Sequence, residues 1–137
     1  MPADEALARL TAPVETASLE RVMAGLEELW RQAGDVAVED RIRFETAVAE
    51  IAGNILQHGD GSATQFRLEL RADADRLEAS FEDGGSRVEV DLSAAQLPDD
   101  LAESGRGLAL ALAAVDELEY RRDGSTNHWR VLRRRTA

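Results

Sequence analysis

Two neighbouring segments alternate strictly between apolar and polar residues, and this alternation constrains the fold more than any other feature of the chain. They cover residues 64–70 and 76–83, and residues 72–75 form the turn between them. Their inward positions are Thr64, Phe66, Leu68 and Leu70 in the first segment and Leu77, Ala79 and Phe81 in the second. Such alternation predicts strands with one face in the core and one face in water. The chain therefore needs a second layer to cover one face of a sheet.

Two segments with helical periodicity are candidates for that layer. We expect Pro13 to open a helical stretch that ends at Gly34, with apolar residues at spacings of three and four. A second helix is predicted from about Glu39 to His58, and the Gly-Asp-Gly sequence at 59–61 ends it. The apolar stripes consist of Leu19, Val22, Met23, Leu26, Leu29 and Trp30 in the first helix and Phe44, Val48, Ile51 and Ile55 in the second.

The remaining elements complete a two-layer arrangement. A short first strand is expected at residues 7–12, a third helix at 108–115, and two further strands at 117–122 and 128–133. Residues 84–106 are irregular, and a loop of that length inside a domain is usually functional, often a lid. The order predicts an α/β two-layer sandwich, with a mixed, mostly antiparallel sheet and helices on one face. A chain of 137 residues fits a single domain that spans 1–137.

The composition excludes several classes of function. The chain has no cysteine, and all 16 of its basic residues are arginine. Disulfides and thiolate catalysis are excluded, as are a P-loop, a eukaryotic-type protein kinase and a Schiff-base enzyme, each of which needs a lysine. The net charge of −11 argues against direct binding to nucleic acid.

The chain also lacks the patterns that direct a protein to a membrane. The acidic residues 1–5 are unlike the start of a secretory signal. The longest stretch without charged or strongly polar residues is 107–115, far shorter than the ~20 residues that span a bilayer. We therefore expect a cytoplasmic protein with no membrane association.

One face of the second predicted helix carries a line of polar residues. Thr46, Glu50, Asn54 and His58 follow one another at intervals of four, between apolar rows. A carboxylate and a carboxamide one turn apart can hold a general base and a metal ion together, because an amide oxygen suits Mg²⁺ and a glutamate accepts a hydroxyl proton. The alternative is the solvent-facing stripe of an ordinary amphipathic helix.

Two glycine-containing sequences are further candidates for a binding site. Asp83 follows the buried row of its strand, where it needs a donor such as the exocyclic amine of adenine, and Gly85 would allow a flat ring to approach the backbone. The sequence Gly105-Arg106-Gly107-Leu108 opens the third predicted helix, where free N–H groups bind phosphate. The alternatives are an Asp-Gly turn after a strand and a flexible loop that leads into a helix.

Taken together, these motifs resemble those of the GHKL superfamily of ATPases. The order is Glu50-x-x-x-Asn54, Asp83-x-Gly85 and Gly105-x-Gly107-Leu108. More narrowly, the chain is similar to the bacterial anti-sigma factor serine/threonine kinases, from about residue 11 to residue 135. The similarity is strongest at AEIAGNILQHG (49–59) and at GRGLALALAAVDELEYRR (105–122). It implies the Bergerat ATP-binding fold.

The resemblance also implies a role for each motif residue. Glu50 is the implied general base, Asn54 the Mg²⁺ ligand, and His58 a residue that shapes the helix end. Asp83 and Gly85 would recognise adenine, residues from about 84 to 106 would form the ATP lid, and Gly105, Arg106, Gly107 and Leu108 would cradle the phosphates. A threonine near adenine corresponds to Thr126 or Asn127, and both stay open. Arg87 stands where the family commonly has the last glycine of Asp-x-Gly-x-Gly.

The function that the resemblance implies is that of an anti-sigma factor serine/threonine-protein kinase. Such a protein uses Mg-ATP to phosphorylate an anti-anti-sigma antagonist with a STAS domain, and it sequesters a sigma factor in a partner-switching pathway. Proteins of this kind commonly form homodimers, and the first strand and helix are the expected interface. A non-catalytic module that binds ATP or ADP and acts only by sequestering its partner is the alternative.

Overall fold

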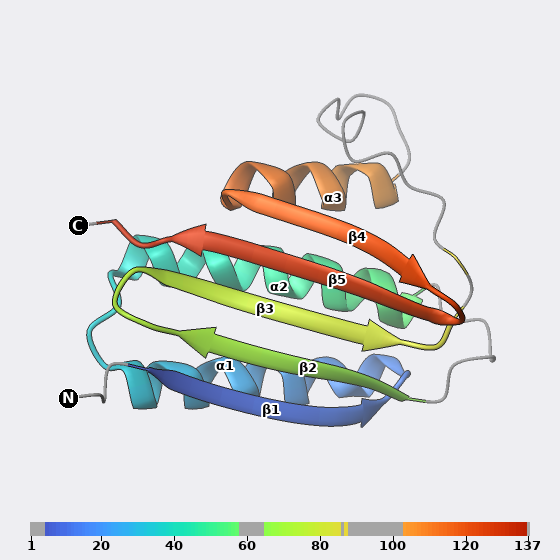
Figure 1. Ribbon diagram of the computed structural model, residues 1–137, viewed down its shortest axis with the longest axis horizontal. Helices are drawn as coiled ribbons and strands as arrows, with labels where there is room; N and C mark the ends of the chain where they lie inside the picture. The colour runs from blue at the N-terminus through green and yellow to red at the C-terminus, as the bar shows by residue number, and fades with distance from the viewer. Residues whose placement is uncertain (1–4, 58–64, 86, 88–102, 137) are drawn as a thin grey trace.

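Five strands form one sheet in the computed structural model, which describes residues 5–57, 65–85, 87 and 103–136, with the backbone alone for 103–106. The strands are β1 (Ala6–Pro13), β2 (Gln65–Ala72), β3 (Arg76–Asp83), β4 (Glu117–Asp123) and β5 (Thr126–Arg134). Their order across the sheet is β1-β2-β3-β5-β4 (Figure 1). Each pairing between these described strands is antiparallel, so the parallel component of the expected mixed sheet is absent from them.

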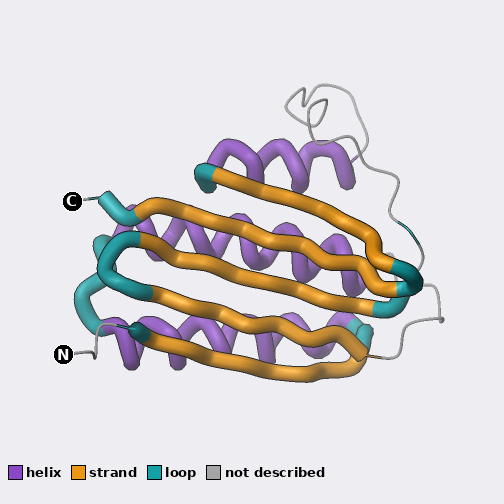
Figure 2. The backbone as a smooth tube through the Cα atoms, in the orientation of Figure 1, coloured by secondary structure: helices purple, strands orange, loops and turns teal. Residues whose placement is uncertain are grey.

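The helices cover one face of this sheet, which confirms the predicted two-layer α/β sandwich. They are α1 (Leu19–Ala33), α2 (Val38–Gln57) and α3 (Glu103–Ala114). Figure 2 shows the helical layer behind the strands. Contacts run from α1 to β1 and β2, from α2 to β3 and β5, and from α3 to α2 and β4. The helices therefore cross the sheet in chain order, with α2 at the centre.

The core lies between the layers because each amphipathic element turns its apolar side inward. Phe66, Leu68 and Leu70 of β2 alternate with exposed or half-buried polar residues, and the same pattern holds along β3. Phe44 and Ile51 of α2 are fully buried against them. The inward positions expected from the alternation are thus confirmed, apart from Thr64, which lies outside the described residues.

Two element boundaries differ from those expected. Pro13 ends β1 instead of opening a helix, and a 3₁₀ turn at Thr16–Ser18 precedes α1. A proline fits there because β1 is an edge strand, and the Ser18 hydroxyl donates to the Pro13 carbonyl at 2.7 Å. In contrast, α3 begins at Glu103, five residues before the expected start at Leu108. Its first turn carries no apolar periodicity, so the pattern of apolar residues did not reveal it.

The other boundaries agree with the predictions to within two residues. Gly34 ends α1, as expected, with a φ of 82° and a hydrogen bond of 2.9 Å from its N–H to the Trp30 carbonyl. Among the described residues, none of the helices is long and apolar enough to cross a membrane.

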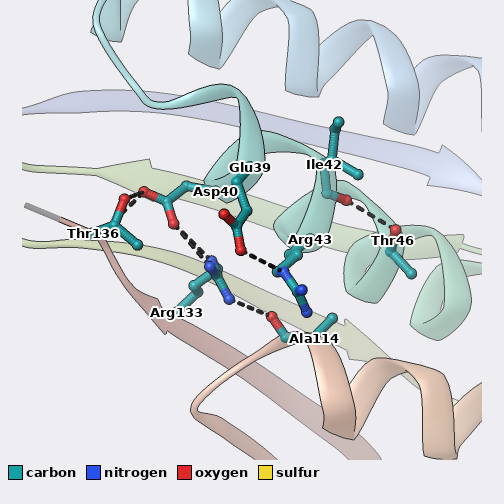
Figure 3. A network of polar contacts seen from close by, with 8 residues as sticks. All are labelled: Glu39, Asp40, Ile42, Arg43, Thr46, Ala114, Arg133 and Thr136. Atoms are coloured by element: carbon teal, nitrogen blue, oxygen red, sulfur yellow. Dashed lines mark hydrogen bonds and ion pairs between the residues drawn. The ribbon is translucent and has the colours of Figure 1, made fainter.

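A buried ion pair joins α2, α3 and β5 at the end of the sandwich where β3 begins (Figure 3). Asp40 accepts from Arg133 at 2.9 Å and, through its second oxygen, from the N–H and hydroxyl of Thr136 at 3.0 Å each. Arg133 also donates to the Ala114 carbonyl at the end of α3, at 2.9 Å. Burial alone would raise the pKa of Asp40, but the hydrogen bonds from Thr136 and Arg133 outweigh it and lower that pKa.

Candidate functional site

Glu50 of α2 lies directly against the backbone of α3. A Cβ built at Gly107 would stand 2.5 Å from Oε1 of Glu50, which is closer than real Cβ contacts allow. The carboxylate of Glu50 can lie this close to the backbone of α3 because residue 107 has no side chain. Glu50 is half-buried, and its carboxylate has no hydrogen-bond or ion-pair partner within the described part of the chain. An unpaired acceptor thus adjoins one of the sequence-predicted glycines.

The other members of the polar line on α2 differ in their surroundings. Asn54 lies one turn beyond Glu50, half-buried, and its carboxamide has no partner among the described residues. Thr46 instead donates its hydroxyl to the Ile42 carbonyl of its own helix at 2.9 Å (Figure 3). His58 lies outside the described residues. Glu50 and Asn54, one turn apart, therefore carry polar groups that form no hydrogen bond within α2.

Asp83 ends β3 on the side of the sheet that faces the helices, as the alternation predicts. Only 8% of the residue is exposed. Its Oδ1 accepts from the N–H of Gly85 at 2.8 Å and from Nδ2 of Asn127 at 3.1 Å. Its Oδ2 has no partner among the residues that the structure describes. This buried carboxylate is therefore held through one oxygen and offers the other as an acceptor.

Thr126 and Asn127 occupy opposite faces of β5. Asn127 pairs with Asp83 across β3 and β5 and is 1% exposed on the inner side. Thr126 points to the opposite side, where it pairs with Asp123 and lines a shallow hollow of about 220 Å³. Asn127 therefore hydrogen-bonds Asp83 on the inner side, whereas Thr126 shares with Asp83 only the lining of that hollow.

Two residues of β4 complete the network, and the sequence analysis assigned no role to either, although both lie in the stretch 105–122 that resembles the family. Arg122 donates to Oδ1 of Asn127 at 2.9 Å and to the Gly85 carbonyl at 2.8 Å. Tyr120 donates to the same Asn127 oxygen at 2.5 Å. Leu118, Tyr120 and Arg122 form the inward row of β4, so strand alternation could have identified these residues as neighbours of the site.

The glycine sequences occupy somewhat different positions from those expected. Gly85 is buried and Gly84 is exposed, and Arg87 is exposed after them. Gly105 and Arg106 belong to the first turn of α3, where the structure describes the backbone alone. Gly107 and Leu108 follow them in the helix. Since α3 starts at Glu103, the N–H of Gly105 lies in the unpaired first turn and that of Gly107 lies beyond it.

Part of the site lies where three elements end or begin on one side of the sandwich. Figure 1 shows that β3 ends, β5 begins and α2 ends on the same side, opposite the chain's C-terminus. Asp83, the last residue of β3, and Asn127, near the start of β5, therefore lie at the end of the sheet toward which α2 runs from Glu50 to its last residue. In the described chain, no three acidic or histidine side chains cluster as a metal centre. A Mg²⁺ bound through Asn54, as the resemblance implies, would have to take its remaining oxygens from phosphates and water.

Comparisons with known proteins agree with this fold. Residues 12–132 match the profile of the family described as histidine kinase-like ATPase domain. A crystal structure of the RsbU and RsbW domains of Rv1364c from Mycobacterium tuberculosis is similar, with a TM-score of 0.66 and 19% sequence identity. The similarity covers 94% of this chain and 32% of that one, so this chain spans about a third of that protein's length. No curated protein sequence matched. The family match covers nearly all of the chain, and the protein therefore belongs to the histidine kinase-like ATPase family.

Proposed function

We propose that the protein is an ATP-dependent serine/threonine kinase that acts on an anti-anti-sigma antagonist and sequesters a sigma factor. The contact between Glu50 and Gly107 carries the proposal. It places the half-buried carboxylate of Glu50, which has no partner in the described part of the chain, beside a glycine of the proposed phosphate-binding sequence. A kinase needs its general base beside the transferred phosphoryl group, and a passive ATP-binding module has no such need.

In this proposal, Asp83 recognises the adenine ring of the nucleotide. An ionised carboxylate only accepts hydrogen bonds, so Oδ2 of Asp83 suits the exocyclic amine of adenine and repels the carbonyl oxygen of guanine. The buried Gly85 leaves its backbone open to a flat ring. The nucleotide would lie between this end of the sheet and the start of α3.

Phosphoryl transfer then requires positioning more than covalent chemistry. The antagonist's serine oxygen forms a bond to the γ-phosphorus, the bond between that phosphorus and the bridging oxygen breaks, and ADP leaves. Glu50 accepts the serine proton. Gly105 and Arg106 hold the phosphates through the first turn of α3 and the Arg106 charge, and Gly107 and Leu108 follow in the next turn, where the absent side chain of Gly107 leaves room for Glu50. Mg²⁺, held by Asn54 and the phosphates, would neutralise charge on the leaving group.

The partners follow from the narrower resemblance of the sequence to anti-sigma factor kinases. That resemblance supports a STAS-domain antagonist as substrate and a sigma factor as the sequestered protein. The similarity of fold to a structure with an RsbW domain supports the same choice. A homodimer through β1 and α1 is part of the proposal, because β1 is an edge strand of the sheet.

Nucleotide binding is tested by thermal unfolding with Mg-ATP, Mg-ADP and Mg-GTP. A ligand at about a hundred times its Kd adds roughly 2.7 kcal/mol, which raises the Tm by a few degrees. We expect both adenine nucleotides to raise the Tm, GTP to have no effect, and Asp83→Asn to abolish the response. Equal responses to ATP and GTP, or none to either, would contradict the assigned site.

Catalysis is tested with Mg-[γ-³²P]ATP and purified STAS-domain proteins, assayed one at a time for incorporated phosphate. We expect Glu50→Ala to abolish labelling and to retain the Tm response to ATP. Glu39→Ala is the matched control, because Glu39 lies on the same helix in an exposed pair with Arg43. Unchanged labelling by Glu50→Ala would exclude Glu50 as the base. If no STAS protein is labelled while ATP still controls the binding of one, the non-catalytic module is the better description.

A further inference from the structure

The polar network beneath Asp83 contains a cation, Arg122, to which the sequence motifs assign no role. Arg122 is half-buried on the inner side of β4, and its Nη1 donates both to the Gly85 carbonyl and to Oδ1 of Asn127. It therefore connects the backbone just beyond β3 with a side chain of β5. Removing this guanidinium would leave both acceptors without that donor.

The donors around Asn127 determine which way its carboxamide points. Arginine has no acceptor, so the atom of Asn127 that contacts Arg122 must be the oxygen. Tyr120 donates to the same oxygen. The amide nitrogen is consequently turned toward Oδ1 of Asp83, at 3.1 Å, and toward the Gly85 carbonyl, at 3.4 Å. Arg122 thereby makes Asn127 a donor to Asp83.

This orientation has a direct effect on the acceptor that the nucleotide would meet. Asn127 and the N–H of Gly85 both donate to Oδ1 and so restrain the carboxylate of Asp83, while Oδ2 has no partner among the residues that the structure describes. A carboxylate anchored in this way accepts an amine without first losing rotational freedom, which strengthens binding. Arg122 also keeps the Gly85 backbone against the sheet, where the base would lie.

We propose that Arg122 and Asn127 are positioning residues of the nucleotide site, which align Asp83 and Gly85 for adenine and thereby set the preference for adenine over guanine nucleotides. This inference rests on the proposed function. The inference goes beyond the proposed function because it assigns nucleotide selectivity to two residues that act through Asp83 and need not touch the nucleotide.

The first test measures Kd for Mg-ATP and Mg-GTP by isothermal titration calorimetry with the full chain. We expect Arg122→Met and Asn127→Val each to weaken ATP binding about tenfold, the effect of losing one hydrogen bond to a charged group, and to leave GTP binding unchanged. Arg121→Met is the matched control, since Arg121 is the neighbour of Arg122 on β4 but is exposed and paired with Asp123 at 3.6 Å. Its Kd values should equal those of the wild type.

A second variant gives a readout that a merely structural role would not produce. Asn127→Asp keeps an acceptor for Arg122 and Tyr120 but places a second carboxylate against Asp83. Two carboxylates in contact share a proton, so one pKa rises. The titratable groups that the structure gives in contact there are Asp83, Tyr120 and Arg122. ATP binding by Asn127→Asp should thus recover to within about threefold of wild type at pH 5.5 and fall about tenfold at pH 8.

The outcomes separate this inference from the function on which it rests. If the wild type binds no ATP, the proposed function fails and this inference fails with it. If the wild type binds ATP but both single variants keep its Kd for ATP, the positioning role is excluded and the kinase proposal stands. If Arg122→Met does not fold, the pH profile of Asn127→Asp decides, and a flat profile excludes the role.

Discussion

Glu50 has room beside α3 only because residue 107 is a glycine. We predict that Gly107→Ala lowers the single-turnover loss of γ-phosphate from bound [γ-³²P]ATP about a hundredfold, because a misplacement of about 1 Å in a catalytic group costs that much. The unfolding free energy should change by less than about 1 kcal/mol, since alanine favours the helix and the displaced atom ends a flexible side chain.

A double-mutant cycle shows whether this effect acts through Glu50. In a Glu50→Gln background, Gly107→Ala should cause no further loss of rate, because the base is already absent. An additional loss of similar size would indicate that Gly107 acts directly on the phosphates instead. Urea unfolding of all four proteins checks that the comparison is made between folded chains.

At this scale, the sequence predicted residue types well and contacts poorly. Asp83 lies where its alternation with Phe81 and Ala79 suggested, because both faces of a strand follow from a local period of two. The contact of Asp83 with Asn127 depends on the register of two strands that are 44 residues apart in the chain. A local period contains no information about such a register, so the sequence left Thr126 and Asn127 undistinguished.

Among the helices, two glycines have opposite structural roles. Gly34 adopts a φ of 82° at the end of α1, a conformation that costs a residue with a side chain about 1–2 kcal/mol. Gly53 lies inside α2, and a Cβ built there meets nothing within 4 Å. We predict that Gly34→Ala lowers the unfolding free energy by about 1 kcal/mol and that Gly53→Ala raises it by about 0.5–1 kcal/mol. Urea unfolding measures both changes. If the two substitutions change the unfolding free energy in the same direction, this interpretation is wrong.

The ion pair between Asp40 and Arg133 holds the ends of three elements together. We predict that Asp40→Asn lowers the unfolding free energy by about 3 kcal/mol at pH 7, because it leaves the buried guanidinium without a counter-ion. Asp35→Asn is the control. Asp35 pairs with Arg135 but its side chain is 87% exposed, so its loss should cost less than about 0.5 kcal/mol.

The pair between Asp40 and Arg133 also predicts that the free energy of unfolding depends on pH. The pKa of Asp40 is lowered in the folded state, so its contribution is complete above the unfolded pKa of about 3.9 and is lost as the pH falls through the folded pKa. The stability difference between wild type and Asp40→Asn should hence be constant from pH 7 to about 5 and shrink in more acidic solution. A difference that does not change down to pH 2.5 would refute the assignment.

Across the whole molecule, charge is distributed unevenly between the two sides of the sheet. The strand face without helices carries seven arginines and six carboxylates, whereas the full chain has 16 arginines and 27 acidic residues. Pairs such as Arg9 with Glu69 and Arg130 with Glu78 cross between strands on this face. The negative charge is therefore concentrated on the rest of the protein, and the open face is nearly neutral.

Arg130 is the most connected residue of that face. It lies 2.6 Å from Glu78, 3.1 Å from Glu117 and 3.7 Å from Glu119, and the hydrogen bond to Glu78 raises its pKa. We predict that Arg130→Leu lowers the unfolding free energy by about 1 kcal/mol, because three carboxylates then repel one another without a counter-ion. Arg121→Leu should cost less than about 0.5 kcal/mol. We expect urea unfolding to show that the difference in unfolding free energy between these two variants becomes smaller as the ionic strength rises.

By itself, the sequence determined the class of fold, the order of the elements and the residues that carry the motifs. Each of these follows from a period of two or 3.6 residues, or from the chemistry of a short motif, and all are local properties of the chain. The start of α3 escaped this reasoning because its first turn has no apolar periodicity.

Only the tertiary structure decided which motif residues meet. The packing of α3 on α2 brings Gly107 to Glu50, and the pairing of β3, β4 and β5 brings Arg122 and Asn127 to Asp83. These contacts join residues that are tens of positions apart, and they exist because the apolar faces of separate elements must be buried against one another. Local sequence patterns thus identify the residue types of the candidate site, whereas the packing of helices and strands around one core determines how those residues are arranged.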